Sequence, residues 1–423
     1  MAAEVHIYQA QTGTGTDTIT FNDVGFTPNC AIVFSTNLTS EGSTDDQAFI
    51  QTFGCWASKG TQWCSYQRKA DGGTSAAYKF IEEDYVSTQR TSGGTLKQRI
   101  EIQSVTAGSA TLNIPTNDTK RRYLIFVFME LNDAWVGTAA KPTSASTQTI
   151  SDGSDLNFTP AAVIVAGKGS ATAPPAVETS MSGSIGFATS TATSDQAAVN
   201  FAGETGTNTW TTRHSTGDCL TILDENTQAV TDDAHLSSLD SGSFDITFSS
   251  TTATANYIGY MAVEGDVWSD NDYTHPTSTG DDTQHNSGVG FEPDAVLELS
   301  SALTAVNTID SSNANIMVGA ASNEGTVGNG VTWNQGTGSD TDRRFQDDAT
   351  INVRNSSATA LNKATISAFG SDGFTRNFSN ADGSNSWKGS VIAFAKAAAV
   401  SYVPYPQPRG EFAGMLPLSG GIN

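Results

Sequence analysis

The segment Gly25-Phe26-Thr27-Pro28 leads into the apolar run Cys30-Ala31-Ile32-Val33-Phe34, and the same pattern returns twice further along the chain. The second copy is Asn157-Phe158-Thr159-Pro160 followed by Ala162-Val163-Ile164-Val165, and the third is Gly290-Phe291-Glu292-Pro293 followed by Ala295-Val296-Leu297-Glu298-Leu299. A glycine lies 28 residues after each phenylalanine, at Gly54, Gly186 and Gly319. Two markers that hold the same spacing in three copies predict one domain used three times.

The repeat divides the 423 residues into three parts of similar length. We expect domains at residues 1–137, 138–272 and 273–397, each large enough to bury a core of its own. Residues 398–423 break the pattern and are expected to form an extended docking arm.

Each copy contains short apolar segments separated by turn-rich sequence, and no amphipathic helical stretch. Because proline cannot donate a hydrogen bond to a strand ladder, the apolar run after Phe-x-Pro should begin a buried strand. This spacing predicts an all-β protein of three tandem antiparallel β-sandwich or jelly-roll-like domains. Later in the copies, Asp218–Leu223 is expected to match Asp348–Val353, with Arg99–Ile102 in the same place in the first copy.

Two proline-containing segments are predicted to link the domains. They are Lys141-Pro142-Thr143-Ser144 and His275-Pro276-Thr277-Ser278, and Trp135 and Trp268 stand ahead of them. We expect each tryptophan to pack at a junction between domains. The three domains could close into a pseudo-threefold arrangement within one chain, or extend and join other chains by cyclic symmetry.

Charge and composition exclude several kinds of partner. The chain has 44 acidic and 21 basic residues, a net charge of -23 and a pI near 4.3. Nucleic-acid binding depends on Lys and Arg neutralising phosphates, so nucleic acid is not an expected partner, nor is an anionic membrane. The first residues lack the basic flank and apolar core of a signal peptide, and no apolar run approaches the ~18 residues of a membrane span. We therefore expect synthesis in the cytoplasm without export by the general route.

No catalytic or metal-binding motif is evident, so no enzyme activity and no cofactor or metal are expected. The five histidines (His6, His214, His235, His275 and His285) have no metal-ligand spacing and are predicted to lie on the surface or in loops. The four cysteines (Cys30, Cys55, Cys64 and Cys219) do not form a disulfide framework or a zinc site, although a Cys55–Cys64 bridge stays open. The acidic groups Glu82-Glu83-Asp84, Asp232-Asp233 and Asp281-Asp282 do not recur between copies, and solvated loops explain them.

One aromatic cluster is a candidate binding patch. Trp56, Trp63 and Tyr66 lie close together in the first copy and could stack on the rings of a glycan. Packing in the core or at an interface is the favoured alternative for these three residues.

The end of the chain has four prolines spaced by aromatic and aliphatic residues. Such spacing favours an extended, polyproline-like backbone. We expect this arm to dock on a neighbouring subunit, and folding back on its own third domain is the alternative. The residues expected to make the contact are Tyr402, Tyr405, Phe412, Met415 and Leu416.

The order of four motifs resembles an uncharacterised family of virion structural proteins encoded by tailed bacterial viruses. The motifs are Gly-Phe-x-Pro-x-Ala-Val, Ser-Ile-Gly-Phe-Ala-Thr-Ser, Asp-Cys-Leu-Thr-Ile-Leu and Tyr-Ile-Gly-Tyr-Met-Ala-Val-Glu-Gly-Asp. The second copy, residues 149–268, carries all of them, whereas the other copies match only the Phe-x-Pro and glycine landmarks. The first copy departs with Phe53-Gly54-Cys55-Trp56 in place of Ile-Gly-Phe-Ala. The resemblance implies a component of a virus particle and supplies no catalytic residues.

Together these observations predict a non-enzymatic structural protein of a tailed virus, made in the host cytoplasm and located in the virion. An exposed capsid decoration or turret-type protein, anchored by its C-terminal arm, is favoured because coiled-coil and collagen-like stalks of tail fibres are absent from the sequence. The expected partners are major capsid or tail proteins and copies of the chain itself. The alternative is a tail-tip or fibre adhesin that binds host-surface glycans. A polysaccharide hydrolase is a third class, but the chain shows no recurring pair of acids for it.

Overall fold

The computed structural model describes residues 3–21, 26–36, 38–39, 44–45, 48–70, 77–90, 95–116, 121–169, 180–204, 210–311, 314–323, 329–335, 341–346, 348–354 and 360–397. Within these residues the protein is all-β, and its one helical turn is a 3-10 segment, Thr193–Asp195. Every strand pairing is antiparallel except a short parallel one between β6 and β13. The predicted all-β, antiparallel fold class is therefore confirmed.

The strands fall into three sets, which we call the first, second and third units (residues 3–129, 133–264 and 266–395). The first unit contains β1 (Ala3–Gln9), β2 (Gly15–Thr20), β3 (Cys30–Ser35), β4 (Thr44–Asp45), β5 (Ala48–Ala57), β6 (Lys59–Gly60), β7 (Trp63–Ala70), β8 (Ala77–Glu83), β9 (Ser87–Arg90), β10 (Leu96–Thr106), β11 (Ser109–Thr116) and β12 (Tyr123–Met129). The second contains β13 (Asp133–Ala140), β14 (Ser146–Ser151), β15 (Ala162–Gly169), β16 (Ser180–Ala188), β17 (Gln196–Glu204), β18 (Trp210–Thr216), β19 (Leu220–Leu223), β20 (Val230–Asp240), β21 (Ser243–Ser250) and β22 (Tyr257–Glu264). The third contains β23 (Asp266–Thr274), β24 (Gly280–Asp282), β25 (Ala295–Ser300), β26 (Ile309–Asp310), β27 (Ala314–Ser322), β28 (Asn329–Gln335), β29 (Thr341–Gln346), β30 (Ile351–Arg354), β31 (Ala360–Gly370), β32 (Gly373–Asn380) and β33 (Lys388–Ala395).

The three units share one strand order. In the first unit a larger sheet runs β1-β12-β3-β5-β7-β8 and a smaller one runs β2-β11-β10-β9. The second unit repeats this as β13-β22-β15-β16-β17-β18 and β14-β21-β20-β19, and the third as β23-β33-β25-β27-β28-β29 and β24-β32-β31-β30. The threefold pattern in the sequence therefore corresponds to a threefold pattern of hydrogen-bonded strands.

The repeated glycine is required by a close approach of two backbones. A Cβ atom at Gly54 would lie 2.1 Å from the carbonyl oxygen of Val86, the residue before β9. The same overlap would occur at 2.2 Å between Gly186 and Cys219, and at 1.8 Å between Gly319 and Thr350. A glycine inside a strand commonly marks such a close approach, and here it does so in all three units.

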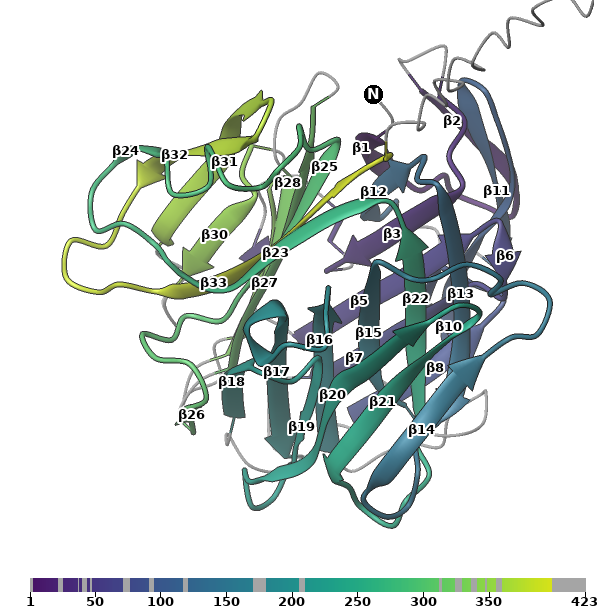
Figure 1. The fold of residues 1–423 in the computed structure, drawn as a ribbon, viewed down its shortest axis with the longest axis horizontal. Coiled ribbons are helices and arrows are strands. Elements are labelled where there is room, and N and C mark those ends of the chain that lie inside the picture. Colours follow the sequence, from purple (N-terminus) through teal and green to yellow (C-terminus); the bar gives the residue numbers. More distant parts are fainter. Residues whose placement is uncertain are drawn as a thin grey trace, which may run out of the picture.

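The first strand after each Phe-x-Pro turn is buried on both faces because a different core lies against each face. Ile32 of β3 points into a core shared by all three units, whereas its neighbour Val33 belongs to the core of the first unit alone. Ile164 and Leu297 bring the second and third units into the shared core. Figure 1 shows the larger sheets meeting in the middle of the molecule, with the smaller sheets of the second and third units on the outside.

Short strands from one unit extend the larger sheet of another. β6 of the first unit pairs with β13 of the second, and β26 of the third unit pairs with β18 of the second. β4 of the first unit pairs with β29 of the third. The last pairing joins the first unit to the third, so each unit is paired with both of the others and the three form a closed ring.

The connections between units meet at one pole of this ring. Asn132, between the first two units, donates its backbone N–H to the carbonyl oxygen of Glu264 at 3.0 Å. Its side-chain oxygen accepts from the backbone N–H of Ala397 at 2.8 Å, and Lys396 pairs with Glu130. The start of β1 and the yellow end of β33 accordingly lie close together in Figure 1.

Two sequence predictions need correction. Arg99–Ile102 does not match Asp218–Leu223, because it lies in β10, the counterpart of β20 and β31. The matching strand of the first unit is β9, Ser87–Arg90, whose polar side chains are all buried. Because these side chains are polar, no apolar run in the sequence indicates this strand.

The expected linkers are also part of the folded units. Lys141 and His275 are only 2% and 1% exposed, because they follow strands β13 and β23 directly. These strands begin at residues 133 and 266, so the expected boundaries at 137/138 and 272/273 fall inside them. Trp135 does pack at a junction, since a Cβ at Gly60 of the first unit would lie 2.9 Å from its indole nitrogen.

Candidate functional site

The three aromatic residues predicted as a glycan patch are buried. Trp63 has no exposed surface, and its Nε1–H donates to the carbonyl oxygen of Tyr260 of the second unit at 2.9 Å. A Cβ at Gly259 would lie 2.4 Å from the Trp63 ring, so the indole occupies the space this glycine leaves. Trp56 lies in the core of the first unit, and Tyr66 is fully buried. None of the three offers a ring face to a sugar, and core and interface packing is their observed role.

The five residues predicted to anchor the arm, Tyr402, Tyr405, Phe412, Met415 and Leu416, lie outside the described residues. The described chain ends at Ala397, at the pole where the unit connections meet.

Each acidic group singled out in the sequence contains one acid that is paired with a buried or half-buried cation. Glu82 pairs with Arg99, and Asp232 lies 3.1 Å from the ammonium of Lys141. Asp282 lies 3.6 Å from the guanidinium of Arg376. The expectation of solvated loops is wrong for these three acids, because they lie on strands β8, β20 and β24.

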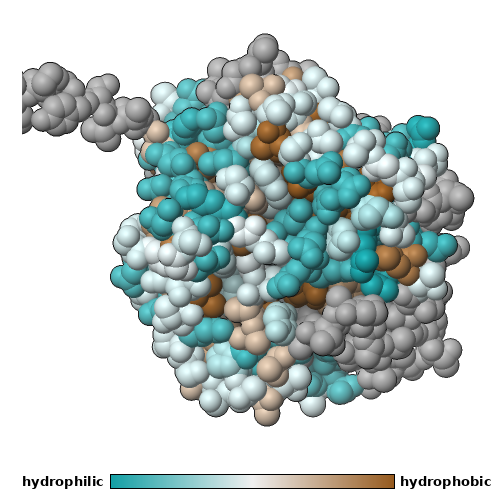
Figure 2. Space-filling view, turned by 90° about the vertical axis from the view of Figure 1, so that its right-hand side faces the viewer, coloured by the Kyte–Doolittle hydropathy of each residue, from teal (hydrophilic) through white to brown (hydrophobic). Residues whose placement is uncertain are grey.

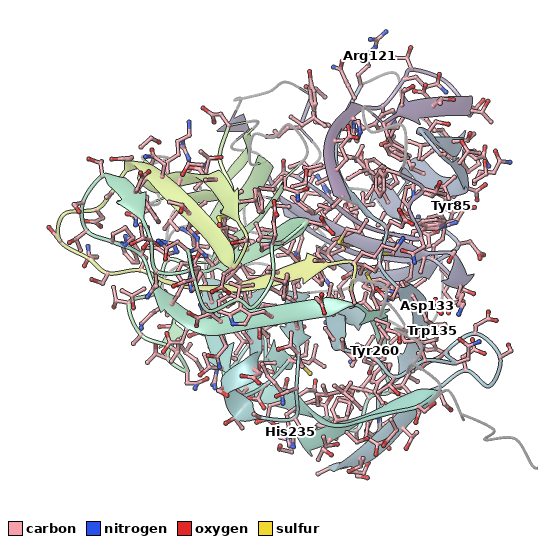
Figure 3. The ribbon with its side chains drawn as sticks, turned by 45° about the horizontal axis from the view of Figure 1, so that its top comes forward. Tyr85, Arg121, Asp133, Trp135, His235 and Tyr260 are labelled. Carbon is pink, nitrogen blue, oxygen red and sulfur yellow. The ribbon has the colours of Figure 1, made fainter. Side chains whose placement is uncertain are left out.

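Three of the five histidines are buried, which corrects the prediction of surface or loop positions. His214, His275 and His285 have exposures of 0%, 1% and 3%. His6 is partly buried beside Glu4 at 2.5 Å, and burial lowers its pKa. Only His235 lies outward on β20, at the periphery of the second unit in Figure 3.

A buried ion pair lies at the centre of the third unit. The guanidinium of Arg376 on β32 donates to the carboxylate of Glu298 on β25 at 2.5 Å, and neither side chain is exposed. The Arg376 guanidinium also lies 4.2 Å from the ring centre of Tyr273 and 4.9 Å from that of Phe374. Burying two charges costs several kcal/mol per ion before pairing, so this site depends on the pairing of Arg376 with Glu298.

His285 joins this ion pair to a second carboxylate. Its Nδ1 lies 2.5 Å from the Arg376 guanidinium, and its Nε2 lies 2.8 Å from Asp270. Arginine can only donate, so Nδ1 must be the acceptor and carry no proton. Nε2 then carries the proton and donates it to Asp270. Although burial acts to raise the pKa of Asp270, the hydrogen bond from His285 lowers it.

A glycine makes room for the aromatic wall of the cluster. A Cβ at Gly389 would lie 2.5 Å from the Tyr273 ring and 2.8 Å from Nε2 of His275. Those two rings stack with their centres 5.2 Å apart. The residue of β22 that corresponds to Gly389 is Ile258. The space that the Ile258 side chain fills in the second unit is thus filled in the third unit by the rings of Tyr273 and His275.

The sequence did carry a signal for this cluster. Glu298 interrupts the apolar run of the third copy at the position that Val165 holds in the second. Arg376 follows Phe374 by two residues, as Ile246 follows Phe244. A charge of each sign at two apolar positions of one repeat could have predicted a buried pair.

The junction between the first and second units is held by charged side chains as well as by Trp63. Lys79 pairs with Glu225 at 2.5 Å, and both side chains are 8% exposed. Lys69 lies 4.3 Å from the ring centre of Trp210, and Lys59 pairs with Asp133.

In addition to the shared core and the β18–β26 pairing, neutral polar groups join the second and third units. Thr189 and Ser269 share a hydrogen bond of 2.6 Å, and the Asn271 amide donates to the carbonyl oxygen of Thr193 at 3.0 Å. The Asn307 backbone N–H donates to the carbonyl oxygen of His214 at 2.7 Å. This junction therefore contains a buried histidine where the other contains lysine–carboxylate pairs.

The cluster in the third unit has the wrong chemistry for a hydrolase. An Asp–His pair activates a nucleophile only when the second imidazole nitrogen faces a hydroxyl or thiol. Here that nitrogen faces Arg376, which cannot act as a nucleophile. Among the described residues, no group of three or more His, Cys, Asp or Glu side chains could hold a metal ion.

The four thiols are free and buried, so no Cys55–Cys64 bridge forms. Burial raises the pKa of all four, that of Cys219 to about 12. Thiols of this kind stay protonated and behave as small apolar residues.

The described surface has no large apolar patch. Ile309 is the only large hydrophobic residue in the described part of the chain that is exposed, at 40%. In Figure 2, polar residues cover most of the face shown, and hydrophobic residues form small separate spots. A partner would have to bind this surface mainly through polar groups.

No helix in the described ranges is long and apolar enough to cross a membrane. No protein-family model, curated protein or solved structure matches this chain.

Proposed function

We propose that the protein is a non-enzymatic structural component of a tailed virus, of the exposed capsid decoration or turret type. The observation that supports the non-enzymatic part is that the polar clusters of the described residues are buried, whereas the features common to all units form strands. The viral part rests on the resemblance of residues 149–268 to virion structural proteins. Its location is then the virion, after synthesis in the host cytoplasm.

In this proposal the three units are three tandem β-sandwich, jelly-roll-like domains, followed by residues 398–423 as an extended arm. Each unit has a larger and a smaller sheet with an apolar core between them, which supports the sandwich. Because the described chain ends at a pole of the ring, an arm that starts there could reach a partner without crossing the surface of a unit.

The proposed partners are major capsid or tail proteins and copies of the chain itself. A net charge of -23 opposes contacts with nucleic acid and with anionic membranes. A glycan-binding adhesin is the less favoured alternative, since the candidate patch of Trp56, Trp63 and Tyr66 is buried.

Imaging of the parent virus particle with this chain located on it tests the proposal directly. We expect density for the closed ring on the outside of the head, with the pole of Ala397 facing the particle. Density at the tail tip, or absence of the chain from purified particles, would overturn the decoration role.

The arm is tested with particles that lack this chain and are then incubated with purified protein. The full chain should bind, and a chain that ends at residue 401 should not. A matched control keeps the length and prolines but replaces Tyr402, Tyr405, Phe412, Met415 and Leu416 by serine. Equal binding of all three proteins would show that the arm is not the anchor.

A further inference from the structure

Three buried histidines form a connected group where the second and third units meet. His275 and His285 lie on the same Tyr273 ring, with ring centres 5.2 and 5.3 Å away. His214 of β18 in the second unit is close enough to His275 that a charge on one opposes a charge on the other. The group therefore runs from the core of the third unit into the neighbouring unit.

The hydrogen bonds of His285 connect it to charged groups on both sides of the ring. Because Arg376 donates to Nδ1, a proton on that nitrogen would break the bond and place an imidazolium against a guanidinium. The negative groups near it are Asp270, which accepts from Nε2, and Glu298 and Asp282, which pair with Arg376. The rings of Trp268 and Phe374 complete its surroundings.

His275 has no compensating partner for a charge. Neither of its ring nitrogens has a hydrogen-bond partner in the part of the chain that the structure describes. Burial, followed by the nearby charge of Arg376 and then by His214, lowers the pKa of His275 to about 3. Its ring also lies 5.7 Å from that of Phe378, so the imidazole is packed as an apolar ring.

His214 reaches the junction from the other side. Burial lowers the pKa of His214 to about 4. The charge of Asp272 acts to raise this pKa, and the charge of Lys388 acts to lower it. The backbones of Asn271 and Lys388 lie beside the ring. Asp272 and Lys388 pair with each other at 2.9 Å, so the charge of Lys388 opposes the effect of this carboxylate on His214.

We propose that this histidine group is an acid-sensitive latch, which keeps the second and third units together at neutral pH and releases them when the histidines take up protons. The inference does not depend on the virion role. It rests on three buried imidazoles at the junction, of which His275 has no hydrogen-bond partner among the described residues and lies near the charge of Arg376, and His214 lies near Lys388. Histidine is the side chain whose charge changes most readily between pH 5 and 8.

The direction of the pH effect follows from the linkage between proton binding and the stability of the closed junction. An exposed histidine titrates near pH 6.5, so the opened junction binds protons below that pH, whereas the closed junction excludes them. The closed form is therefore most stable above pH 6.5. It loses stability as the pH falls from 6.5 towards 4, the range between the pKa of an exposed histidine and that of His214.

Hydrogen–deuterium exchange on the full chain at pH 7.5 and pH 5.0 tests this latch, after correction for the intrinsic pH dependence of exchange. We expect protection of β18, β23 and β33 to fall at least tenfold at pH 5.0. The matched strands of the other junction, β7 and β22, should keep their protection. An equal change at both junctions, or no change at either, would overturn the proposal.

Histidine-to-glutamine variants distinguish protonation of the histidines from a nonspecific loss of structure at low pH. In His285→Gln the amide oxygen can accept from Arg376 and the amide nitrogen can donate to Asp270, but the side chain cannot be protonated. This variant and His214→Gln should each reduce the loss of protection at pH 5.0. His235→Gln, which replaces the outward-facing histidine, should behave like the original chain, and a matching rescue by it would count against the latch. The exchange comparison on the unaltered chain still decides the question if a variant does not fold.

Discussion

The second and third units have the same strand order, yet their cores are built from different chemistry. At the positions where β15 and β21 of the second unit carry Val165 and Ile246, β25 and β32 of the third carry Glu298 and Arg376. The comparison teaches that this backbone does not require a purely apolar core. It requires that the side chain at each position fit its neighbours, and the same strand register accepts either a hydrophobic contact or a buried ion pair.

Breaking the ion pair should have the largest effect. Glu298→Val leaves Arg376 buried without its main counter-charge, which should lower the free energy of unfolding by about 3–5 kcal/mol. Urea unfolding measures the loss. The double variant Glu298→Val with Arg376→Ile copies the second unit, and we expect it to recover most of the stability, since an apolar replacement of a buried pair is often neutral. If the single and double variants lose the same free energy of unfolding, the third unit does not accept the apolar side chains that the second unit has at these positions.

Replacing the repeated glycine should lower stability equally in the second and third units. Gly186→Ala and Gly319→Ala would each force apart two backbones whose Cβ-to-oxygen distances would be 2.2 and 1.8 Å. We expect each to cost about 3 kcal/mol in urea unfolding, the upper end for overpacking. Gly153→Ala is the control, because a Cβ added there would have nothing within 4 Å. A large loss in only one unit would show that the close approach is not a shared requirement.

The glycine specific to the third unit should have a smaller effect. Gly389→Ala places a methyl group 2.5 Å from the Tyr273 ring, and we expect a loss of about 1–3 kcal/mol in urea unfolding. At the counterpart position, Ile258→Ala should also lower stability but for a different physical reason, because it opens a cavity whereas Gly389→Ala overpacks the site. A neutral Gly389→Ala would mean that the Tyr273 ring can shift without cost.

The smallest effect concerns a carboxyl group of the second unit. Burial and then the nearby Asp233 raise the pKa of Asp218 to about 6. The folded form therefore holds this proton more tightly than the unfolded chain does, and the stability it contributes at low pH is lost as the pH rises through 6. Asp218→Asn should raise the free energy of unfolding at pH 7 by less than about 1 kcal/mol, since solvent partly screens the group, and should give no gain at pH 3.5. A gain of the same size at both pH values would assign the effect to packing.

Much of the fold could be predicted from the sequence because the same features recur at the same spacing in each copy. The apolar runs after Phe-x-Pro and the strand glycines can be recognised from composition and spacing alone. The strands β13 and β23 are harder to recognise, since their polar ends and nearby prolines resemble loop sequence. They are strands because partners in the same sheet, β22 and β33, satisfy their backbones over almost their whole length.

The candidate site was harder to predict, because burial depends on contacts between distant residues. Trp63 and Tyr260 are 197 positions apart, and no local pattern indicates that the indole would be enclosed by another unit. His214, His275 and His285 likewise have no common spacing. The charged residues at apolar repeat positions were the one local signal of the buried cluster.

The meeting of the unit connections at one pole makes this chain a natural candidate for circular permutation. The residues near Ala3, Asn132, Gly265 and Ala397 all gather there, so in a chain without residues 398–423 a short linker could join residues 3 and 397, with new ends opened at Gly265. Such a rearranged chain would keep every pairing between strands while changing which unit is made first. The order of synthesis and the geometry of the ring are thus separable properties of this protein.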